Sequence, residues 1–430
     1  MRDASQTMNS STRLLIIADV GGEETRHLGD EAMLEANLDA LRRLIPGVVF
    51  TIVSRDPAWV TKRYGVTAVA TFGFPHDPSA ITERRALLES LLTDAAKGGR
   101  EEAIIESTVD AVAGTDGLVV SGGGNLSATW PDLLYERVAL LNLARIFGKP
   151  TVVLGQTIGP MLGDDGRRQL AAALSSARFV GVRELPSAAL AFELGVPPER
   201  VWYQSDDALF LEESPAPLQM PAPKSGPSIA VTIDPQVRAA GRNLFGSLIA
   251  QLRELSKRTG AHLVLIPHVY GNESAASPSD LTEAHLIAEG VGLPQTVVAE
   301  GLDARQAKQV TGDAALVISS RYHPIVFGLA AAVPCIGIYG DDYCRIKLEG
   351  ALAHAQLERW AITYDDVARG RLVTDALELW HTRDELRCEL ESRRETWRVE
   401  FHERWSAVLR AIDPTTILPS ANGSTPGGPV

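Results

Sequence analysis

Apolar runs alternate with amphipathic stretches along most of the chain, and this alternation predicts its secondary structure. LLIIADVGG (14–22) is typical of a buried strand that runs into a glycine turn. A helical pattern follows over 30–44 and a second strand over 48–54. This succession is a β-α-β unit, the unit of a parallel sheet. The same alternation recurs in GLVVSGGGN (117–125), 132–148, 150–160, 178–185 and 201–210.

A proline-rich stretch divides the chain. EESPAPLQMPAPKSGP (212–227) contains five prolines and no apolar period, which favours an interdomain linker. After it, SIAVTID (228–234) restarts the alternation. The later elements are expected as helices at 242–258, 281–291 and 324–332, and as strands at 261–268, 315–318 and 333–339. The predicted organisation is an N-terminal domain at 13–211, a linker at 212–227, a C-terminal domain at 228–372, helices at 373–412 and a disordered tail at 413–430.

The predicted fold class is α/β, with two Rossmann-like parallel-sheet domains facing a cleft and a C-terminal helical region. In such sheets ligands bind beyond the carboxyl ends of the strands. Between two domains the cleft is the natural place for a site. The residues that follow each strand are therefore the candidates for chemistry.

Composition narrows the function classes. With 41 basic and 54 acidic residues the chain carries a formal charge of −13, which argues against a nucleic-acid partner. Its three cysteines are too few and too scattered for a disulfide framework or a zinc site, and Cys335 lies in an apolar strand. The first residues lack the apolar core of a signal peptide, and the longest apolar run, 325–339, contains Pro334. We therefore expect a cytoplasmic protein without a transmembrane segment.

The segment ALVISSRYHPIVFGLAAAVPCIGIYGDDYC (315–344) raises the sharpest question. It places Arg321 and His323 between a strand and a helix that Pro324 is predicted to open. A turn needs neither residue, so this pair suggests an anionic ligand, with the helix dipole adding positive potential. An imidazole there could titrate near neutral pH.

Other strand ends carry further candidates. Arg183 could hold a carboxylate or phosphate together with Arg321, or simply pair with a neighbouring carboxylate. Asp206 and Asp207 could act as a base or cap the next helix. The remaining candidates for ligand contact are Ser320, Gly123, Gly124, Asn125, Gln156, Asp30 and His268. The glycines could cradle an anion or serve only a turn at positive φ. The tryptophans, including Trp130 and Trp202, are interpreted as core rather than sugar platforms.

The ordered series of motifs resembles the polysaccharide pyruvyl transferase family. The resemblance covers most of residues 14–350, and its motifs are the LGDEA loop, SGGGNL, GQTIGP, VRELPSAALAFELG, a strand-end aspartate and SSRYHPIVFGLAAAVPCIGI. Arg321 and His323 match the family's Arg-x-His, and Arg183 matches an arginine in its VR-E/D-x-x-S segment. Members often place a lysine after the strand that follows; here Tyr343 aligns with it, and Arg345 or Lys347 lies nearby.

The resemblance implies a glycosyltransferase-B-like fold and the transfer of an enolpyruvyl unit from phosphoenolpyruvate to two hydroxyls of a sugar. The products would be a pyruvate ketal and phosphate. In this scheme Arg183 and Arg321 hold the donor, and His323 protonates its methylene carbon. Asp206, Asp207 or Asp30 accepts the hydroxyl proton. The scheme needs no cofactor and no metal.

Two alternatives remain open. One is a nucleotide-sugar transferase of the same fold, and the other is a non-catalytic relative that binds an anionic glycan or a partner protein. The expected partners are phosphoenolpyruvate and a sugar or glycan precursor. A lipid-linked precursor would be compatible with peripheral membrane contact, and the long C-terminal helices with a homodimer.

Overall fold

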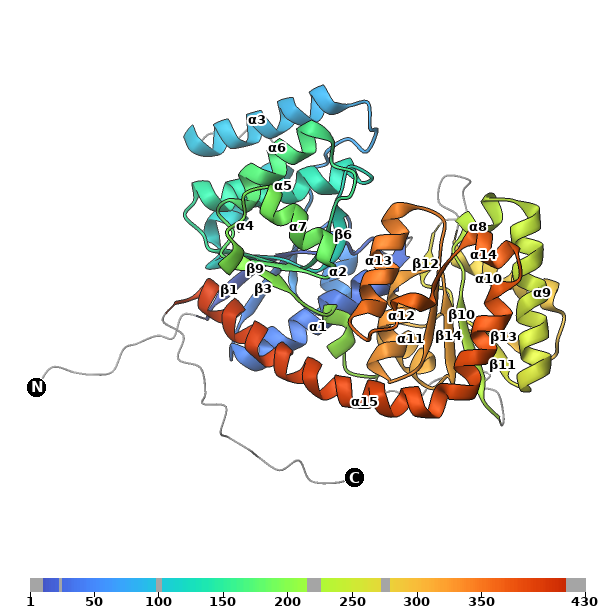
Figure 1. The fold of residues 1–430 in the computed structure, drawn as a ribbon. Helices are drawn as coiled ribbons and strands as arrows, with labels where there is room; N and C mark the ends of the chain where they lie inside the picture. The colour runs from blue at the N-terminus through green and yellow to red at the C-terminus, as the bar shows by residue number, and fades with distance from the viewer. Residues whose placement is uncertain (1–10, 23–24, 98–102, 215–225, 272–278, 415–430) are drawn as a thin grey trace, which may run out of the picture.

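Two parallel sheets organise the chain, one before residue 204 and one after residue 227 (Figure 1). The computed structural model describes residues 11–22, 25–97, 103–214, 226–271 and 279–414. Both sheets are flanked by helices, so the α/β class and the arrangement of two Rossmann-like domains are confirmed. Most of the predicted linker and nearly all of the predicted tail lie outside the described residues.

The N-terminal sheet has the order β4-β3-β1-β5-β7-β8-β9, with β6 paired to β7. Its strands are β1 (Arg13–Ile17), β3 (Val49–Ser54), β4 (Thr67–Ala70), β5 (Gly117–Val120), β6 (Gly123–Leu126), β7 (Thr151–Ile158), β8 (Phe179–Val182) and β9 (Val201–Tyr203). Its helices are α1 (Leu28–Leu44), α2 (Pro57–Tyr64), α3 (Ile81–Lys97), α4 (Ala103–Gly114), α5 (Pro131–Ile146), α6 (Gly163–Leu174), α7 (Leu185–Glu193), η1 (Pro198–Arg200) and η2 (Asp207–Phe210). The chain order reverses between β1 and β5, and at such a switch point the loops part to leave a ligand crevice.

The C-terminal sheet has the order β13-β11-β10-β14-β15-β16 and reverses between β10 and β14. Its strands are β10 (Ser228–Thr232), β11 (His262–Leu265), β13 (Thr296–Val298), β14 (Leu316–Ser319), β15 (Cys335–Tyr339) and β16 (Ala361–Thr363). Its helices are α8 (Pro235–Ala239), α9 (Arg242–Thr259), α10 (Asp280–Val291), α11 (Ala304–Gly312), α12 (Tyr322–Ala330), α13 (Asp342–Ala353), η3 (Glu358–Trp360), α14 (Tyr364–Ala368) and α15 (Arg371–Ile412). Arg321 and His323 therefore follow a strand at the switch point.

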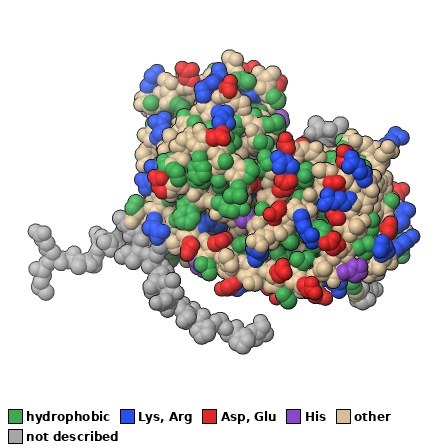
Figure 2. Space-filling model, in the orientation of Figure 1, with side chains coloured by type: hydrophobic (Ala, Val, Ile, Leu, Met, Phe, Trp, Pro, Cys, Tyr) green, Lys and Arg blue, Asp and Glu red, His purple; other side chains and the backbone are tan. Residues whose placement is uncertain are grey.

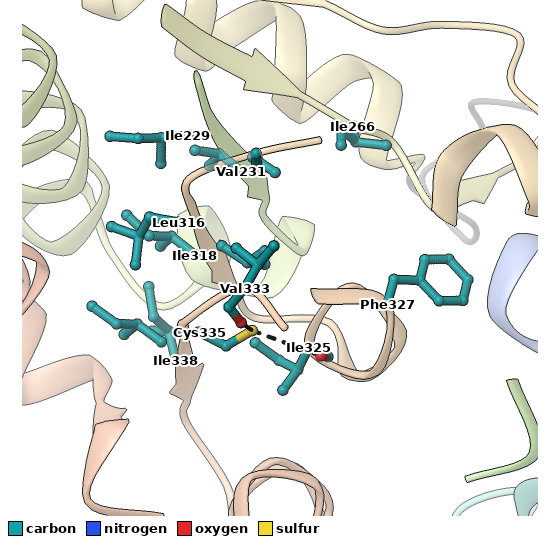
Figure 3. Packing of buried hydrophobic residues seen from close by; sticks show 14 of the residues in the cluster. Ile229, Val231, Ile266, Leu316, Ile318, Ile325, Phe327, Val333, Cys335 and Ile338 are labelled. Carbon is teal, nitrogen blue, oxygen red and sulfur yellow. Dashed lines mark hydrogen bonds between the residues drawn. The ribbon is translucent and has the colours of Figure 1, made fainter. Parts of the chain in front are cut away.

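Buried aliphatic side chains hold each sheet to its helices. Figure 3 shows this packing in the C-terminal domain, where Ile229 and Val231 of β10 lie near Ile318 of β14. Cys335 is fully buried in the same cluster, and its thiol lies 3.7 Å from the carbonyl oxygen of Ile325. The expectation that Cys335 is a small core residue is confirmed.

The two domains are in contact rather than separated by an open cleft. Strands β2 (Arg26–His27) and β12 (Val269–Tyr270) pair antiparallel across the boundary, a pairing that the sequence pattern does not predict. Apolar residues of α1 and of the segment around η2 belong to the same buried cluster as the C-terminal sheet. The carboxyl edges of the two sheets are thereby brought together.

The predicted C-terminal helices form one continuous helix, α15, which runs along both domains (Figure 1). It packs against α9 of the C-terminal domain and reaches β7 and β8 of the N-terminal sheet. None of the helices that the structure describes combines the length and apolar character that a membrane crossing requires. In the view of Figure 2, acidic and basic side chains are interspersed over the C-terminal domain, so this face presents no extended basic surface.

Candidate active site

Arg321 and His323 lie at the start of α12, directly beyond β14. The helix begins at Tyr322 rather than at Pro324, so Arg321 is its N-cap and His323 lies in its first turn. The prediction of a gap at 321–323 was wrong because proline fits anywhere in a first turn, where backbone N–H groups have no helical partner. The hydroxyl of Ser319 shapes the turn, since it accepts from the Arg321 N–H at 2.9 Å.

Helix α1 encloses the imidazole of His323 from the opposite domain. A β-carbon on Gly29 would lie only 1.8 Å from Nδ1 of His323, so only glycine allows this approach. Nε2 of His323 has no hydrogen-bond partner within the described part of the chain; a carboxylate oxygen of Asp206 lies 4.0 Å away. Burial lowers the pKa of His323 to about 4, against the opposing effect of the Asp206 and Asp30 charges. The expectation of titration near neutral pH therefore does not hold for the donor-free protein.

Asp206 is an ionised carboxylate beside His323. Burial by itself would raise the pKa of Asp206, but the guanidinium of Arg183, 2.6 Å away, lowers it below its usual value. Arg183 is almost fully buried and also donates to the carbonyl of Gly123 and the hydroxyl of Thr157. Its guanidinium carbon lies 4.4 Å from the ring centroid of Tyr322. These contacts favour a role for Arg183 in holding Asp206 over direct contact with a ligand.

Asp207 points away from His323, into the end of the N-terminal sheet. A β-carbon on Gly155 would lie 2.8 Å from its carboxylate, so the residue is packed against the strand backbone. Arg404 of α15 pairs with it at 3.1 Å, and the Asn37 amide donates to it at 3.3 Å. Burial raises the pKa of Asp207. Of the two candidate bases, the geometry favours Asp206.

Arg321 is held by two aspartates of its own domain. Its guanidinium lies 2.6 Å from Asp234, just past β10, and 2.7 Å from Asp280 at the start of α10. The hydroxyl of Ser320 accepts from the backbone N–H of Asp234 at 2.7 Å, so Ser320 shapes this loop. About a quarter of the Arg321 side chain is exposed, in contrast to Arg183. Of the two arginines, Arg321 is thus the one a ligand can reach.

Asp30 lies in the first turn of α1, which begins at Leu28, two residues earlier than the predicted start at residue 30. Its carboxylate lies 3.5 Å from the imidazole of His27. Although burial opposes it, this hydrogen bond and the nearby cations lower the pKa of Asp30. Asp19, His27 and Asp30 each place one ligand atom within 4.8 Å of the others, a spacing that a metal ion could bridge.

His268, a further candidate for ligand contact, is buried beside Phe327 of α12. Its side chain is almost fully buried, and its ring centroid lies 5.5 Å from that of Phe327. Neither ring nitrogen has a hydrogen-bond partner among the described residues. Burial lowers the pKa of His268 well below its ordinary value, so the imidazole is neutral.

The glycine-rich segment forms a strand instead of the predicted loop. Residues 123–126 pair with β7 as β6, and α5 begins only at Pro131. A β-carbon on Gly124 would lie 2.2 Å from the Tyr343 hydroxyl, so close packing explains this glycine; positive φ does not. The Nδ2 atom of Asn125 is buried and has no hydrogen-bond partner in the part of the chain that the structure describes. The Gln156 amide donates to backbone carbonyls, including that of Ser121 at 2.5 Å. Gln156 therefore stabilises the sheet end.

Lys347 lies within α13, so a search limited to the residues that directly follow a strand does not find it. The structure nevertheless brings this cation close to the site. Its ammonium group lies 4.7 Å from the ring centroid of Tyr343 and 5.4 Å from that of Tyr322. A β-carbon on Gly124 would lie 3.4 Å from it, so Lys347 faces the N-terminal domain. Within the described residues it has no carboxylate within 4.0 Å, in contrast to Arg183 and Arg321. In the sequence, the only signal for Lys347 is its position shortly after the Arg-x-His segment.

Comparisons with known proteins identify the family and support the fold. The family model for polysaccharide pyruvyl transferases matches residues 27–342, most of the chain. UDP-GlcNAc 2-epimerase from Neisseria meningitidis, bound to UDP-GlcNAc, superposes with a TM-score of 0.57 at 10% identity, covering 93% of this chain and 100% of that one. HepE from Anabaena, in complex with UDP and glucose, gives 0.55 at 12% identity over 93% and 100% of the two chains. The UDP-GlcNAc 2-epimerase from Methanocaldococcus jannaschii gives 0.55 at 9% identity over 85% and 92%. At such identities the likeness concerns the glycosyltransferase-B-like fold alone. No curated protein matches the sequence closely enough to count as a relative.

Proposed function

The chain belongs to the polysaccharide pyruvyl transferase family, and on that premise we propose that it transfers the enolpyruvyl unit of phosphoenolpyruvate to two hydroxyls of a sugar. The products are a pyruvate ketal and phosphate. The observation that carries the proposal is the position of His323, whose unpartnered Nε2 lies 4.0 Å from Asp206 where the two carboxyl edges meet.

Lys347 and Arg321 are the donor ligands in this proposal. Lys347 has no carboxylate partner among the described residues, so it can bind the phosphate without breaking an ion pair. Arg321 contacts Asp234 and Asp280 through its three nitrogens, and each terminal nitrogen keeps a second N–H for the donor carboxylate. The N-terminus of α12 adds positive potential beside both. Arg183 holds Asp206 in place.

His323 moves the protons. It is neutral before the donor binds, because burial keeps its pKa near 4. Two anionic groups arriving beside it favour the imidazolium, so it can take a proton from the donor's phosphate. His323 then protonates the methylene carbon, and the first sugar hydroxyl attacks C2 and returns a proton to the imidazole. Phosphate leaves with the electrons of its C–O bond. The second hydroxyl closes the ketal. Its proton and the proton held by the imidazole leave with the phosphate as dihydrogen phosphate, so His323 returns to its neutral form.

Calorimetric titration with phosphoenolpyruvate tests the donor site. Lys347→Met should weaken binding about 10-fold or more, since it removes a charge-assisted contact. Lys257→Met, at an exposed position of α9, is the matched control and should bind like wild type. Equal donor affinity in the Lys347 and Lys257 variants contradicts the assignment. UDP-sugars in the same titration test the nucleotide-sugar alternative.

Phosphate release tests the chemistry. His323→Gln should retain donor affinity within a few-fold but lose turnover, a loss of about 3–5 kcal/mol of transition-state stabilisation. Turnover close to wild type in this variant refutes the role of His323. No donor binding by the wild-type protein, with and without sugars present, refutes the donor itself.

A further inference from the structure

A second group of polar and aromatic side chains lies at the same edge of the N-terminal sheet, outside the site around His323. Trp130, the N-cap of α5, exposes 40% of its surface, although tryptophan is normally well buried. The expectation that Trp130 is a core residue was therefore wrong. Its ring centroid lies 6.2 Å from that of His76, and the two planes are inclined by 35°. Together the rings present an open aromatic surface.

Hydrogen-bonding groups border this surface. Asp132 in the first turn of α5 is buried, and its two oxygens lie 2.9 Å from Nδ1 of His76 and 2.6 Å from the guanidinium of Arg55. Arg55 and His76 each expose half or more of their side chains. Among the described residues, Arg55 donates a side-chain hydrogen bond only to Asp132, through one of its nitrogens, and about half of its side chain is exposed. Donors and an acceptor thus lie beside the indole.

The loop that carries His76 is fixed before any ligand binds. The buried carboxylate of Glu136, one turn along α5 from Asp132, accepts the backbone N–H groups of residues 72–74 at 2.7–3.3 Å. Phe74 packs against Tyr135 of the same helix, with ring centroids 5.5 Å apart. A platform whose rings and charges are pre-ordered loses little entropy when it binds.

We propose that Trp130, His76, Arg55 and Asp132 form a subsite for a hexose ring of the acceptor. The apolar C–H face of the sugar lies on the indole, and its hydroxyls bond to the guanidinium, imidazole and carboxylate. Trp130 is six positions along the chain from Gly124, whose carbonyl accepts from the Tyr343 hydroxyl beside Lys347. That segment spans at most about 20 Å. The subsite therefore binds one sugar of the acceptor glycan while another sugar of the same glycan receives the pyruvyl group.

Direct binding of oligosaccharides tests this subsite, which rests on the proposed function for its acceptor. Linear tetrasaccharides of glucose, galactose or mannose are added to the wild-type protein and binding is measured by saturation-transfer NMR and calorimetry. Trp130→Ala should weaken the affinity for the tetrasaccharide about 10-fold. Trp130→Phe should weaken it less, because phenylalanine keeps part of the stacking face. Arg55→Ala should also weaken it. Val399→Ala, at an exposed apolar position of α15, should bind like wild type.

The possible outcomes separate the two proposals. Failure of all these tetrasaccharides to bind wild type at millimolar concentration, or equal binding by Trp130→Ala, overturns the subsite. A parallel titration with phosphoenolpyruvate reports on the donor site alone, and Trp130→Ala should leave that affinity unchanged. Sugar binding that depends on Trp130 in a protein that binds no phosphoenolpyruvate supports the subsite and refutes pyruvyl transfer.

Discussion

Substituting Gly29 by alanine tests whether the enclosure of His323 matters. The added β-carbon would lie 1.8 Å from Nδ1 and 2.2 Å from Cγ of the imidazole, where ordinary contact begins near 3.4 Å. Either the imidazole or the start of α1 must therefore move by about 1.6 Å. The helix is anchored by the β2–β12 pairing and by the hydrogen bond from the Leu28 N–H to the His268 carbonyl at 3.0 Å. We expect the imidazole to give way.

The expected consequences concern turnover and the pKa of His323. A misplacement of about 1 Å can cost a factor of about 100 in rate, so Gly29→Ala should lose at least that much phosphate release. An imidazole pushed out of its enclosure is better hydrated, so the pKa of His323 should rise from about 4 toward its ordinary value. Donor affinity should change little, because the three atoms nearest to the added β-carbon belong to His323 and not to Lys347 or Arg321.

Gly246→Ala is the matched control. Gly246 is also helical, in α9, and a β-carbon there would meet nothing within 4 Å. This variant should keep its activity and gain roughly 0.5–1 kcal/mol of stability from helix propensity. The assay is an NMR pH titration of the histidine Cε1–H signals, with phosphate release measured in parallel. Wild-type turnover together with an unchanged pKa of His323 in Gly29→Ala would refute the reasoning.

Three further predictions concern buried charges. The folded-state pKa of His323 is about 4 against 6.5, so the unfolded chain binds more protons between those values and stability should rise as the pH increases from about 4 to 6.5. On acidification from pH 6.5 to 4, urea unfolding should show that wild type loses up to about 3 kcal/mol more stability than His323→Gln. Arg404→Ala leaves the buried Asp207 without its ion pair and should cost about 3–5 kcal/mol, while the double variant with Asp207→Asn should cost less than the sum; additive losses in the double-mutant cycle contradict the pairing. The ammonium of Lys308 on α11 contacts the carbonyls of residues 208, 209 and 211 at 3.3, 2.8 and 2.5 Å, so Lys308→Met should destabilise the fold by about 2–4 kcal/mol in the same urea assay, and an unchanged midpoint argues against this contact.

The sequence predicts the architecture because the hydrophobic pattern of each helix or strand can be recognised within a short stretch of residues. A short run such as LLII at 14–17 is apolar at every position, as expected for a strand of a parallel sheet that is covered on both faces. The order of the elements then places their carboxyl ends at one edge, and His323 and Asp206 are found there together. The pairing of β2 with β12 was not predictable, because two residues on each side carry no periodic signal.

Neighbours distant in the chain decide the role of each site residue, which is why the sequence leaves open whether Arg183 contacts a ligand or pairs with a carboxylate. Arg183 and Arg321 look equivalent as guanidinium groups at strand ends, but one is buried against Asp206 and the other is partly exposed beside Asp234 and Asp280. A buried ion pair of this kind holds its partner's geometry and is costly to break. In the sequence Lys347 stands out only as a basic residue shortly after the Arg-x-His segment, as Arg345 does, whereas in the fold its ammonium group faces Gly124 across the domain boundary. The proposed donor carries a carboxylate and a phosphate and so needs a cation that is not already neutralised, and only the contacts between domains reveal which one that is.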